Sequence, residues 1–341
     1  MRASEVSSFL SYLFFDDYKP SIEYYLKCKV SRSNYTESYI EYKISSTLDD
    51  SNIRDLEDTI KHHVEVIYKD FRYKVRVYHE LLSSKCDFRT IKSKELVLGE
   101  GYDGLVTIPL NEETNNYLIV GASGSGKSSL AVSIIKNLKD NGVEVWISDN
   151  KGSHDYDFLQ LPLTKNVYEF IGMLDRFEIE VEHRLAVDKA HKPLLYVIDE
   201  VFPISCLESK LKKNIFNRLA LIMSRCRSSN CHILIITQRA TTDIIDPRLM
   251  ANISNRICLA TSSQQESINV LGDDSAFRIE TIGRGILSVN GRFTEFQSFY
   301  LKQTKNDNKQ QTPPTTIEVD TIQDERIPIE TETKILSKKL G

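Results

Sequence analysis

Residues 121–128 have the types and the spacing of a phosphate-binding loop, because they match the pattern G-x-x-x-x-G-K-S. Glycine has no side chain to block an anion, so backbone N–H groups in such a loop can cradle phosphate oxygens. Lys127 can reach the β- and γ-phosphates of a nucleotide, and the Ser128 hydroxyl can ligate Mg²⁺. A strand-like run at 117–120 and a helix-like run at 129–138 flank the loop, as the motif requires. We expect these residues to bind the phosphates: Gly121, Ala122, Ser123, Gly124, Ser125, Gly126, Lys127, Ser128 and Ser129.

Two acids and one amide are candidates for the rest of a hydrolytic site. The apolar run 194–198 ends in Asp199 and Glu200, and strand ends in an alternating α/β chain gather at one edge of the sheet. Asp199 would hold Mg²⁺ through water, and Glu200 would polarise the attacking water. Gln238 ends another strand-like run and would sense the γ-phosphate. The alternatives are a helix cap for Glu200 and an ordinary polar strand end for Gln238.

Several arginines follow these motifs in the chain. An arginine supplied to the γ-phosphate, often by a neighbouring subunit, accelerates phosphoryl transfer by roughly 10³–10⁵. The candidates are Arg225, Arg227, Arg239 and Arg256, of which we rank Arg256 and Arg225 first. A surface or structural role is the alternative for each of them.

The elements that must position these residues alternate along the chain. From residue 117 onward, apolar runs of strand length alternate with amphipathic, helix-like runs, which predicts a mostly parallel sheet covered on both faces. Asn290 and Gly291, between two strand-like runs, predict a hairpin. The expected strands include 117–120, 143–147, 194–198, 232–236 and 256–259, and the expected helices are 128–140, 167–191, 207–227 and 263–271.

The chain outside this region divides into two further parts. Residues 1–95 carry no nucleotide-binding signal and predict a small α+β domain. Its expected strands are 21–31, 39–45, 64–68 and 73–78, and its expected helix is 49–63 with Ser51 as the N-cap. We assign 96–303 to the ATPase domain and 304–341 to a disordered polar tail, which is rich in Thr, Lys, Gln, Pro, Asp and Glu and lacks aromatic residues.

Composition limits the other function classes. The net charge is −4 and the sequence pI is about 6.0, so any contact with nucleic acid must come from a local basic surface. The six cysteines form no C-x-x-C pair, which indicates reduced thiols and neither a disulfide framework nor a zinc site. No run approaches the roughly 20 apolar residues of a membrane span. We therefore expect a cytoplasmic protein whose membrane association, if any, goes through a partner.

Five segments, in this order, resemble the motor domain of the FtsK/SpoIIIE DNA translocases, within the wider FtsK–HerA ATPase group. They are GASGSGKSS, WISDNKG, LLYVIDEVF, RCRSSNCHILIITQRATTDII and ANISNRICLATSS. The resemblance covers residues 98–301. Its most specific part is the combination of Thr237-Gln238-Arg239 with Ala251-Asn252-Ile253 and Arg256-Ile257.

The resemblance implies a RecA-like P-loop NTPase fold and a ring of six identical subunits that hydrolyses ATP with Mg²⁺. It also implies that double-stranded DNA passes through the ring and touches loops at the pore. The residues placed there are Arg227, Arg239, Thr241, Thr242 and Arg248. Ala240 stands where the family usually has proline, and we expect neither a membrane anchor before the motor nor a winged-helix module after it. These departures favour a small motor of a plasmid, integrative element or phage, with a relaxase, replication or secretion partner bound through the tail.

Two other functions remain open at the level of the sequence. A motor of the same ATPase group could move protein, as in specialised secretion systems. A nucleotide-dependent loader or switch could assemble on a replication protein without translocating. ATP turnover with and without duplex DNA distinguishes the three, because only the DNA translocase should be stimulated by DNA.

Overall fold

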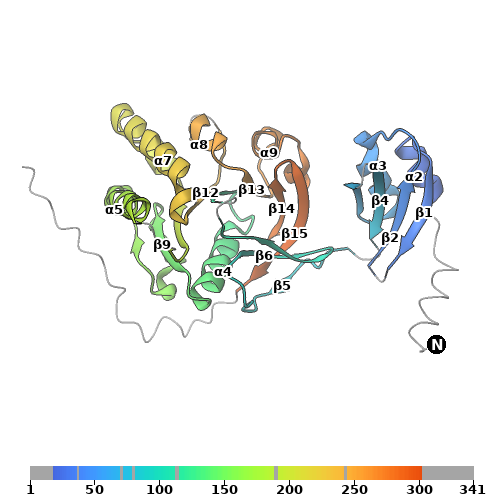
Figure 1. The fold of residues 1–341 in the computed structure, drawn as a ribbon. Coiled ribbons are helices and arrows are strands. Elements are labelled where there is room, and N and C mark those ends of the chain that lie inside the picture. The colour runs from blue at the N-terminus through green and yellow to red at the C-terminus, as the bar shows by residue number, and fades with distance from the viewer. Residues whose placement is uncertain are drawn as a thin grey trace, which may run out of the picture.

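Two β-sheets with separate cores make up the described structure (Figure 1). The computed structural model describes residues 18–36, 38–69, 72–78, 81–111, 115–187, 191–241 and 244–301. The predicted tail 304–341 and Thr242 lie outside these residues. Within them, no helix is long and apolar enough to cross a membrane.

The N-terminal sheet is antiparallel, with the strand order β1-β2-β4-β3. Helices α2 and α3 contact each other and pack on it through Ile22, Leu26 and Leu56, which are fully buried. The strands are β1 (Val30–Tyr35), β2 (Tyr39–Ile44), β3 (Val64–Lys69) and β4 (Arg72–Tyr78); the helices are α2 (Lys19–Tyr25) and α3 (Ile53–Ile60), with a 3₁₀ turn η1 (Asp50–Asn52) before α3. A small α+β unit is present here, as the sequence predicts.

Two local predictions in this unit are wrong. Residues 21–31 do not form one strand, because 19–25 is a helix that begins with Pro20 in its first turn, where proline is preorganised for a helix. Ile22 and Leu26 point into the core at the four-residue spacing of a helix, while the tyrosines between them gave a misleading strand-like pattern. Ser51 is not the N-cap of α3: Asn52 takes that position, and its side chain makes no capping bond.

The large sheet has eleven strands, with a parallel half and an antiparallel half. Its order is β10-β9-β11-β12-β8-β13-β14-β15-β6-β7, with β5 paired to β15. Neighbours from β10 to β13 are parallel, and those from β13 to β7 are antiparallel. The strands are β5 (Cys86–Asp87), β6 (Leu96–Gly101), β7 (Gly104–Ile108), β8 (Asn116–Val120), β9 (Glu144–Asp149), β10 (Leu163–Thr164), β11 (Leu194–Asp199), β12 (Cys231–Thr237), β13 (Asn255–Leu259), β14 (Arg284–Val289) and β15 (Arg292–Tyr300).

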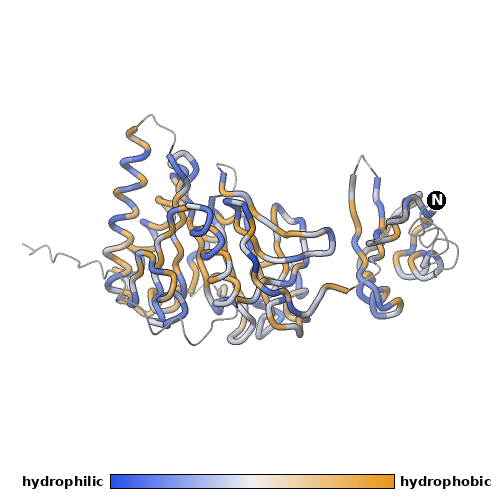
Figure 2. Tube along the Cα trace, turned by 90° about the horizontal axis from the view of Figure 1, so that it is seen from below, coloured by the Kyte–Doolittle hydropathy of each residue, from blue (hydrophilic) through white to orange (hydrophobic). Residues whose placement is uncertain are grey.

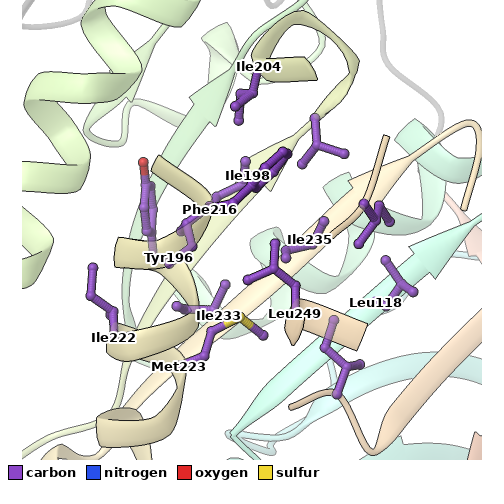
Figure 3. Close-up of a cluster of buried hydrophobic side chains, with 14 of the residues drawn as sticks. Leu118, Tyr196, Ile198, Ile204, Phe216, Ile222, Met223, Ile233, Ile235 and Leu249 are labelled. Carbon is purple, nitrogen blue, oxygen red and sulfur yellow. The ribbon is translucent and has the colours of Figure 1, made fainter. Parts of the chain in front are cut away.

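Helices cover both faces of this sheet, so the apolar strands lie inside (Figure 2). One core lies under α4, and the other lies under α5 and α7. Figure 3 shows Ile222 and Met223 of α7 beside Ile233 of β12 in the second core. The helices are α4 (Lys127–Asp140), α5 (Val167–Ala186), α6 (Phe202–Ser205), α7 (Ser209–Ser229), α8 (Pro247–Ala251) and α9 (Gln264–Leu271), with 3₁₀ turns η2 (Asp157–Leu159) and η3 (Ser275–Arg278).

The prediction of an α/β P-loop fold with a mostly parallel sheet is confirmed by this architecture. The hairpin at Asn290 and Gly291 is also confirmed, and both residues have the positive φ angles (51° and 76°) that a tight hairpin turn requires. The helix expected at 167–191 ends earlier, at Ala186. The one expected at 207–227 is the single helix α7, and the separate short helix α6 precedes it.

The segment between the two sheets packs on the larger one. Cys86 and Asp87 pair with β15, and Ile91 N donates to Asn137 Oδ1 of α4 at 2.8 Å. Arg284 Nη2 donates to the carbonyls of Leu82 and Ser83, at 3.0 Å each. We therefore propose a boundary between the two domains near residue 80, which differs from the boundary at residue 95 that the absence of nucleotide-binding signals predicts.

Candidate active site

The phosphate loop joins the end of β8 to the start of α4. Gly124 and Gly126 have φ angles of 79° and 105°, a region in which other residues are strained. A Cβ on Gly126 would lie 3.1 Å from Gly283 Cα, so this glycine also permits close backbone packing. The Ala122 N–H donates to Ala260 O at 2.7 Å, which ties the loop to the segment that follows β13. The loop is therefore held by neighbouring segments at Ala122 and Gly126, whereas the space beside Gly124 is open.

Lys127 is the first residue of α4 and points back into the loop. Its Nζ donates to Gly121 O and Ala122 O, at 2.7 Å each, and the residue is only 6% exposed. Burial and, to a smaller extent, the nearby Lys151 ammonium lower the pKa of Lys127 to about 8, against the opposing effect of Glu200 and Asp199. A buried ammonium with a lowered pKa is stabilised by an incoming anion, such as a phosphate.

Asp199 ends β11, which lies between β9 and β12. Tyr156 Oη donates to Asp199 Oδ2 at 2.8 Å, and burial raises the pKa of the carboxyl group. Asp199 Oδ1 is buried and has no hydrogen-bond partner among the described residues. A buried carboxylate oxygen that lacks a hydrogen bond fits a divalent cation or one of its waters, because Mg²⁺ prefers oxygen ligands. The donor set, with the Ser128 hydroxyl at the start of α4, is therefore compatible with Mg²⁺.

Glu200 is fixed by contacts from three segments. Its Oε1 accepts hydrogen bonds from Thr237 Oγ1 at 3.0 Å and from Phe202 N at 3.3 Å. Its backbone N donates to Ile236 O, and Asn150 Nδ2 donates to its carbonyl at 2.9 Å. Glu200 also has a φ of 69°, which is uncommon for a residue with a side chain. Such an arrangement is typical of functional positions, where neighbours maintain a strained backbone.

Lys151 follows β9 and lies against both acids. Its Nζ is 3.7 Å from Asp199 Oδ1 and 3.6 Å from Glu200 Oε2. Sequence analysis assigned no role to Lys151, Asn150, Tyr156 or Thr237. The signal that could have found Lys151 and Asn150 is their position directly after a buried strand, at the sheet edge where ligands bind.

Gln238 lies where the sequence predicts, beside the phosphate loop. It follows Thr237, which pairs with Val120 at the end of β8. The strand ends of β8, β11 and β12 therefore bring together the loop, the two acids and the amide. We call this edge of the sheet the carboxyl edge.

A pocket of about 210 Å³ opens beside the first turns of α4. It lies next to the two serines that follow Lys127. Its lining residues are Ser128, Ser129, Val132, Asp155, Tyr300 and Leu301.

The two arginines ranked first lie at the opposite edge of the sheet, which we call the amino edge. Arg225 is in the last turns of α7, just before β12 begins, and its Nη1 is 3.4 Å from Glu182 Oε1. Arg256 is near the start of β13, and its three nitrogens donate to the carbonyls of Ile253, Val270 and Met250, at 3.2 Å each. Both guanidinium groups therefore make their contacts at this edge and not at the phosphate loop.

The residues assigned to DNA do not form one cluster. Arg239 is at the carboxyl edge with its side chain 68% exposed, 3.7 Å from Glu266 Oε1, and Thr241 follows it. Arg227 is exposed at the amino edge, in the last turn of α7. Arg248 pairs with Asp246 and donates to Asn217 of α7. Thr242 lies outside the described residues.

Comparisons with known proteins identify sequence relatives of the region that carries this site. The sequence profile of the Novel STAND NTPase 3 family (nSTAND3) matches residues 108–243, which include the phosphate loop, the acids and Gln238. The DNA translocase FtsK of Staphylococcus aureus strain Mu50 is 26% identical over 239 residues, 60% of this chain and 30% of that protein. The DNA translocase FtsK of Caldanaerobacter subterraneus is 29% identical over 234 residues, 60% of this chain and 32% of that protein. The chain thus spans less than a third of the length of these relatives.

Solved structures share the fold. The pCW3 conjugation coupling protein TcpA, solved in a monomer form with ATPγS, has a TM-score of 0.62 at 16% identity and covers 84% of this chain and 96% of its own. ATPases 2 and 3 of Thermomonospora curvata EccC, in complex with a signal sequence peptide, have a TM-score of 0.53 at 14% identity, with 66% of this chain and 44% of that chain covered. The chain is thus similar in sequence to FtsK DNA translocases over about 60% of its length, and it shares its fold with these solved ATPases.

Proposed function

We propose that this protein is an ATPase that couples ATP hydrolysis to the movement of DNA. The observation that carries the proposal is a complete set of hydrolytic groups, Lys127, Asp199 and Glu200, in a domain related in sequence to proteins named as DNA translocases. A degenerate domain kept only for its fold would not need to keep Glu200 in a strained backbone conformation beside the loop.

The proposed roles follow from the geometry. The backbone of residues 121–129 cradles the phosphates, and Lys127 exchanges its two carbonyl acceptors for phosphate oxygens. Ser128 and Asp199 hold Mg²⁺, which when bound neutralises charge on the phosphates. Glu200, oriented by Thr237, accepts a hydrogen bond from the attacking water. Gln238, beside the loop, positions the same water.

We place the nucleoside in the pocket beside Ser128 and Ser129. Tyr300, which is 46% exposed, offers an aromatic face to a base, and Val132 offers an apolar surface. Asp155 on the pocket wall can accept hydrogen bonds from ribose hydroxyls.

We propose that six subunits form a ring around double-stranded DNA. Arg225 lies at the edge opposite its own phosphate loop, so it can act only on the nucleotide of a neighbouring subunit. Arg256 is better explained as a structural residue, because its nitrogens already bind three carbonyls. The proposed contacts to DNA phosphates come from Arg227, Arg239, Thr241, Thr242 and Arg248. Arg239 and Arg227 are the strongest of these candidates, because both are exposed.

Two kinds of cargo, DNA and protein, are considered for this ATPase. The relation to FtsK and the fold shared with a conjugation coupling protein support DNA as the cargo, in a transfer or mobilisation apparatus. The fold is also shared with ATPases of the type VII secretion protein EccC, so a protein cargo is the second candidate.

ATP turnover by the full chain tests the proposal. We expect long duplex DNA to stimulate hydrolysis, and we expect the stimulation to fall steeply with salt, because contacts to phosphates release counterions. Turnover that ignores DNA but responds to a secreted protein would favour the second candidate. Slow turnover under every condition would instead indicate a nucleotide-dependent switch.

A further inference from the structure

We propose that Lys151 is a second cation for the γ-phosphate, held on Asp199 and Glu200 until a nucleoside triphosphate binds. This inference rests on the proposed ATPase function and adds a substrate-contacting residue to it. Neither the phosphate-loop motif nor the two acids identify this lysine.

The position of the ammonium group is the first observation. Lys151 Nζ lies between the two acids, 3.7 Å from Asp199 Oδ1 and 3.6 Å from Glu200 Oε2. Both N···O distances are longer than that of a good hydrogen bond. The ammonium group therefore interacts with both acids through its charge, and its N–H donors stay available for a ligand. The side chain is 28% exposed, which leaves it open to a ligand that enters the site.

The backbone that carries Lys151 is fixed to the same acids. Asn150 N donates to Asp199 O at 3.0 Å, and Asn150 Nδ2 donates to Glu200 O at 2.9 Å. Lys151 N donates to Asp149 Oδ1 at 3.1 Å, and Gly152, with a φ of 66°, turns the chain directly afterwards. The lysine is therefore built into the site, and only its flexible side chain has to move when a ligand arrives.

The balance of charge gives the direction of that movement. Lys127 and Lys151 bring two positive charges to the site, and Asp199 and Glu200 bring two negative ones. A nucleoside triphosphate bound with Mg²⁺ would add a net negative charge to the site, most of it at the phosphates. Mg²⁺ would also compete with Lys151 for Asp199. Lys151 then gains more from the phosphate oxygens than from the acid it leaves, because ammonium–phosphate contacts are charge-assisted.

Lys127 and Lys151 differ in what they can recognise. Lys127 is buried in the loop and can bind phosphates that ATP and ADP share, whereas Lys151 is next to Glu200, where the attacking water and the terminal phosphate meet. Lys151 thus distinguishes ATP from ADP, and its departure from Glu200 frees that carboxylate for the water.

Nucleotide affinities of the full-length variants test this assignment. Displacement of a fluorescent nucleotide, with Mg²⁺ present, gives the affinities for ATPγS and for ADP. In Lys151→Met we expect the affinity for ATPγS to fall about tenfold or more, the usual effect of losing one charge-assisted hydrogen bond, and the affinity for ADP to stay within about twofold. Lys151→Arg, which keeps the charge, should restore part of the preference for ATPγS.

Matched variants separate this role from a structural one. Lys136 pairs with Asp140 on α4 and is exposed to a similar degree, at 33% of its side chain, so Lys136→Met should leave both affinities unchanged. Equal losses for ATPγS and ADP in Lys151→Met, or no loss for either, would overturn the assignment. If the unaltered protein binds neither nucleotide, the proposed ATPase function itself fails, and with it the role of Lys151 as a phosphate ligand.

Discussion

Nucleotide binding should take up a proton near pH 8, because Lys127 is a buried cation with a lowered pKa that bound phosphates would raise. Burial and the Lys151 ammonium bring the pKa of Lys127 to about 8. Bound phosphates favour the charged form and should return this pKa at least to the usual value of about 10.4 for lysine. Because the bound state holds the proton more tightly than the free state, affinity is greatest below pH 8 and declines as pH rises through it.

The magnitude follows from the two pKa values. If Lys127 titrates at about 8 in the free protein and well above 9 in the complex, nucleotide affinity should fall about tenfold between pH 7 and pH 9, or about 1.4 kcal/mol. The uptake at pH 8 should be about half a proton per nucleotide bound. The phosphates of the nucleotide contribute little, since their last ionisation, at a pKa of about 6, is nearly complete over this range.

Calorimetry with ADP in two buffers of different ionisation enthalpy measures both quantities. Lys136→Met, which alters an exposed lysine on the same helix, should show the same proton uptake as the unaltered protein. A dissociation constant that is flat from pH 7 to pH 9, with no proton uptake, would refute the reasoning. It would mean either that Lys127 is not desolvated or that it does not face the phosphates.

Three further substitutions test single groups of the site. Glu200→Gln should bind ATP normally but slow hydrolysis by about 10²-fold or more, as expected for loss of a group that activates water; a normal rate in single-turnover assays would assign that role to another residue. Thr237→Val, which removes the hydroxyl that bonds Glu200 Oε1, should slow hydrolysis about tenfold at unchanged ATP affinity, and a weaker affinity without a slower rate would argue against its positioning role. Tyr300→Ala should weaken ADP binding by about 1–3 kcal/mol, the usual contribution of base–aromatic stacking. The affinity for inorganic phosphate should be the same in this variant as in the unaltered protein. Unchanged ADP binding would place the base outside the pocket that Tyr300 lines.

The phosphate loop could be predicted from the sequence because its chemistry is local. The glycine spacing, the preceding strand and the following helix occupy consecutive residues, and the structure shows β8, the loop and α4 in that order. Asp199 and Glu200 could be predicted for a similar reason, since a buried strand that ends in acids must place them at the carboxyl edge of a parallel sheet.

The contacts of Lys151 and Arg256 could not be predicted because they depend on strand order and on long-range packing. Lys151 meets the acids only because β9 is the direct neighbour of β11, a pairing that no local pattern encodes. Arg256, with Arg225, ranked first as a trans-acting arginine, yet its guanidinium group binds carbonyls of two separate segments, residues 250–253 and the end of α9. The helix α2 was missed because its tyrosines hid the spacing of Ile22 and Leu26.

The rate of ATP hydrolysis by the purified chain, measured against duplex DNA of increasing length, tests the central claim most directly. If the protein is a DNA-moving ATPase, the rate should rise with duplex length, fall as salt is raised, and be lower by about 10²-fold or more in Glu200→Gln. A rate that is the same with and without DNA at every salt concentration would contradict it.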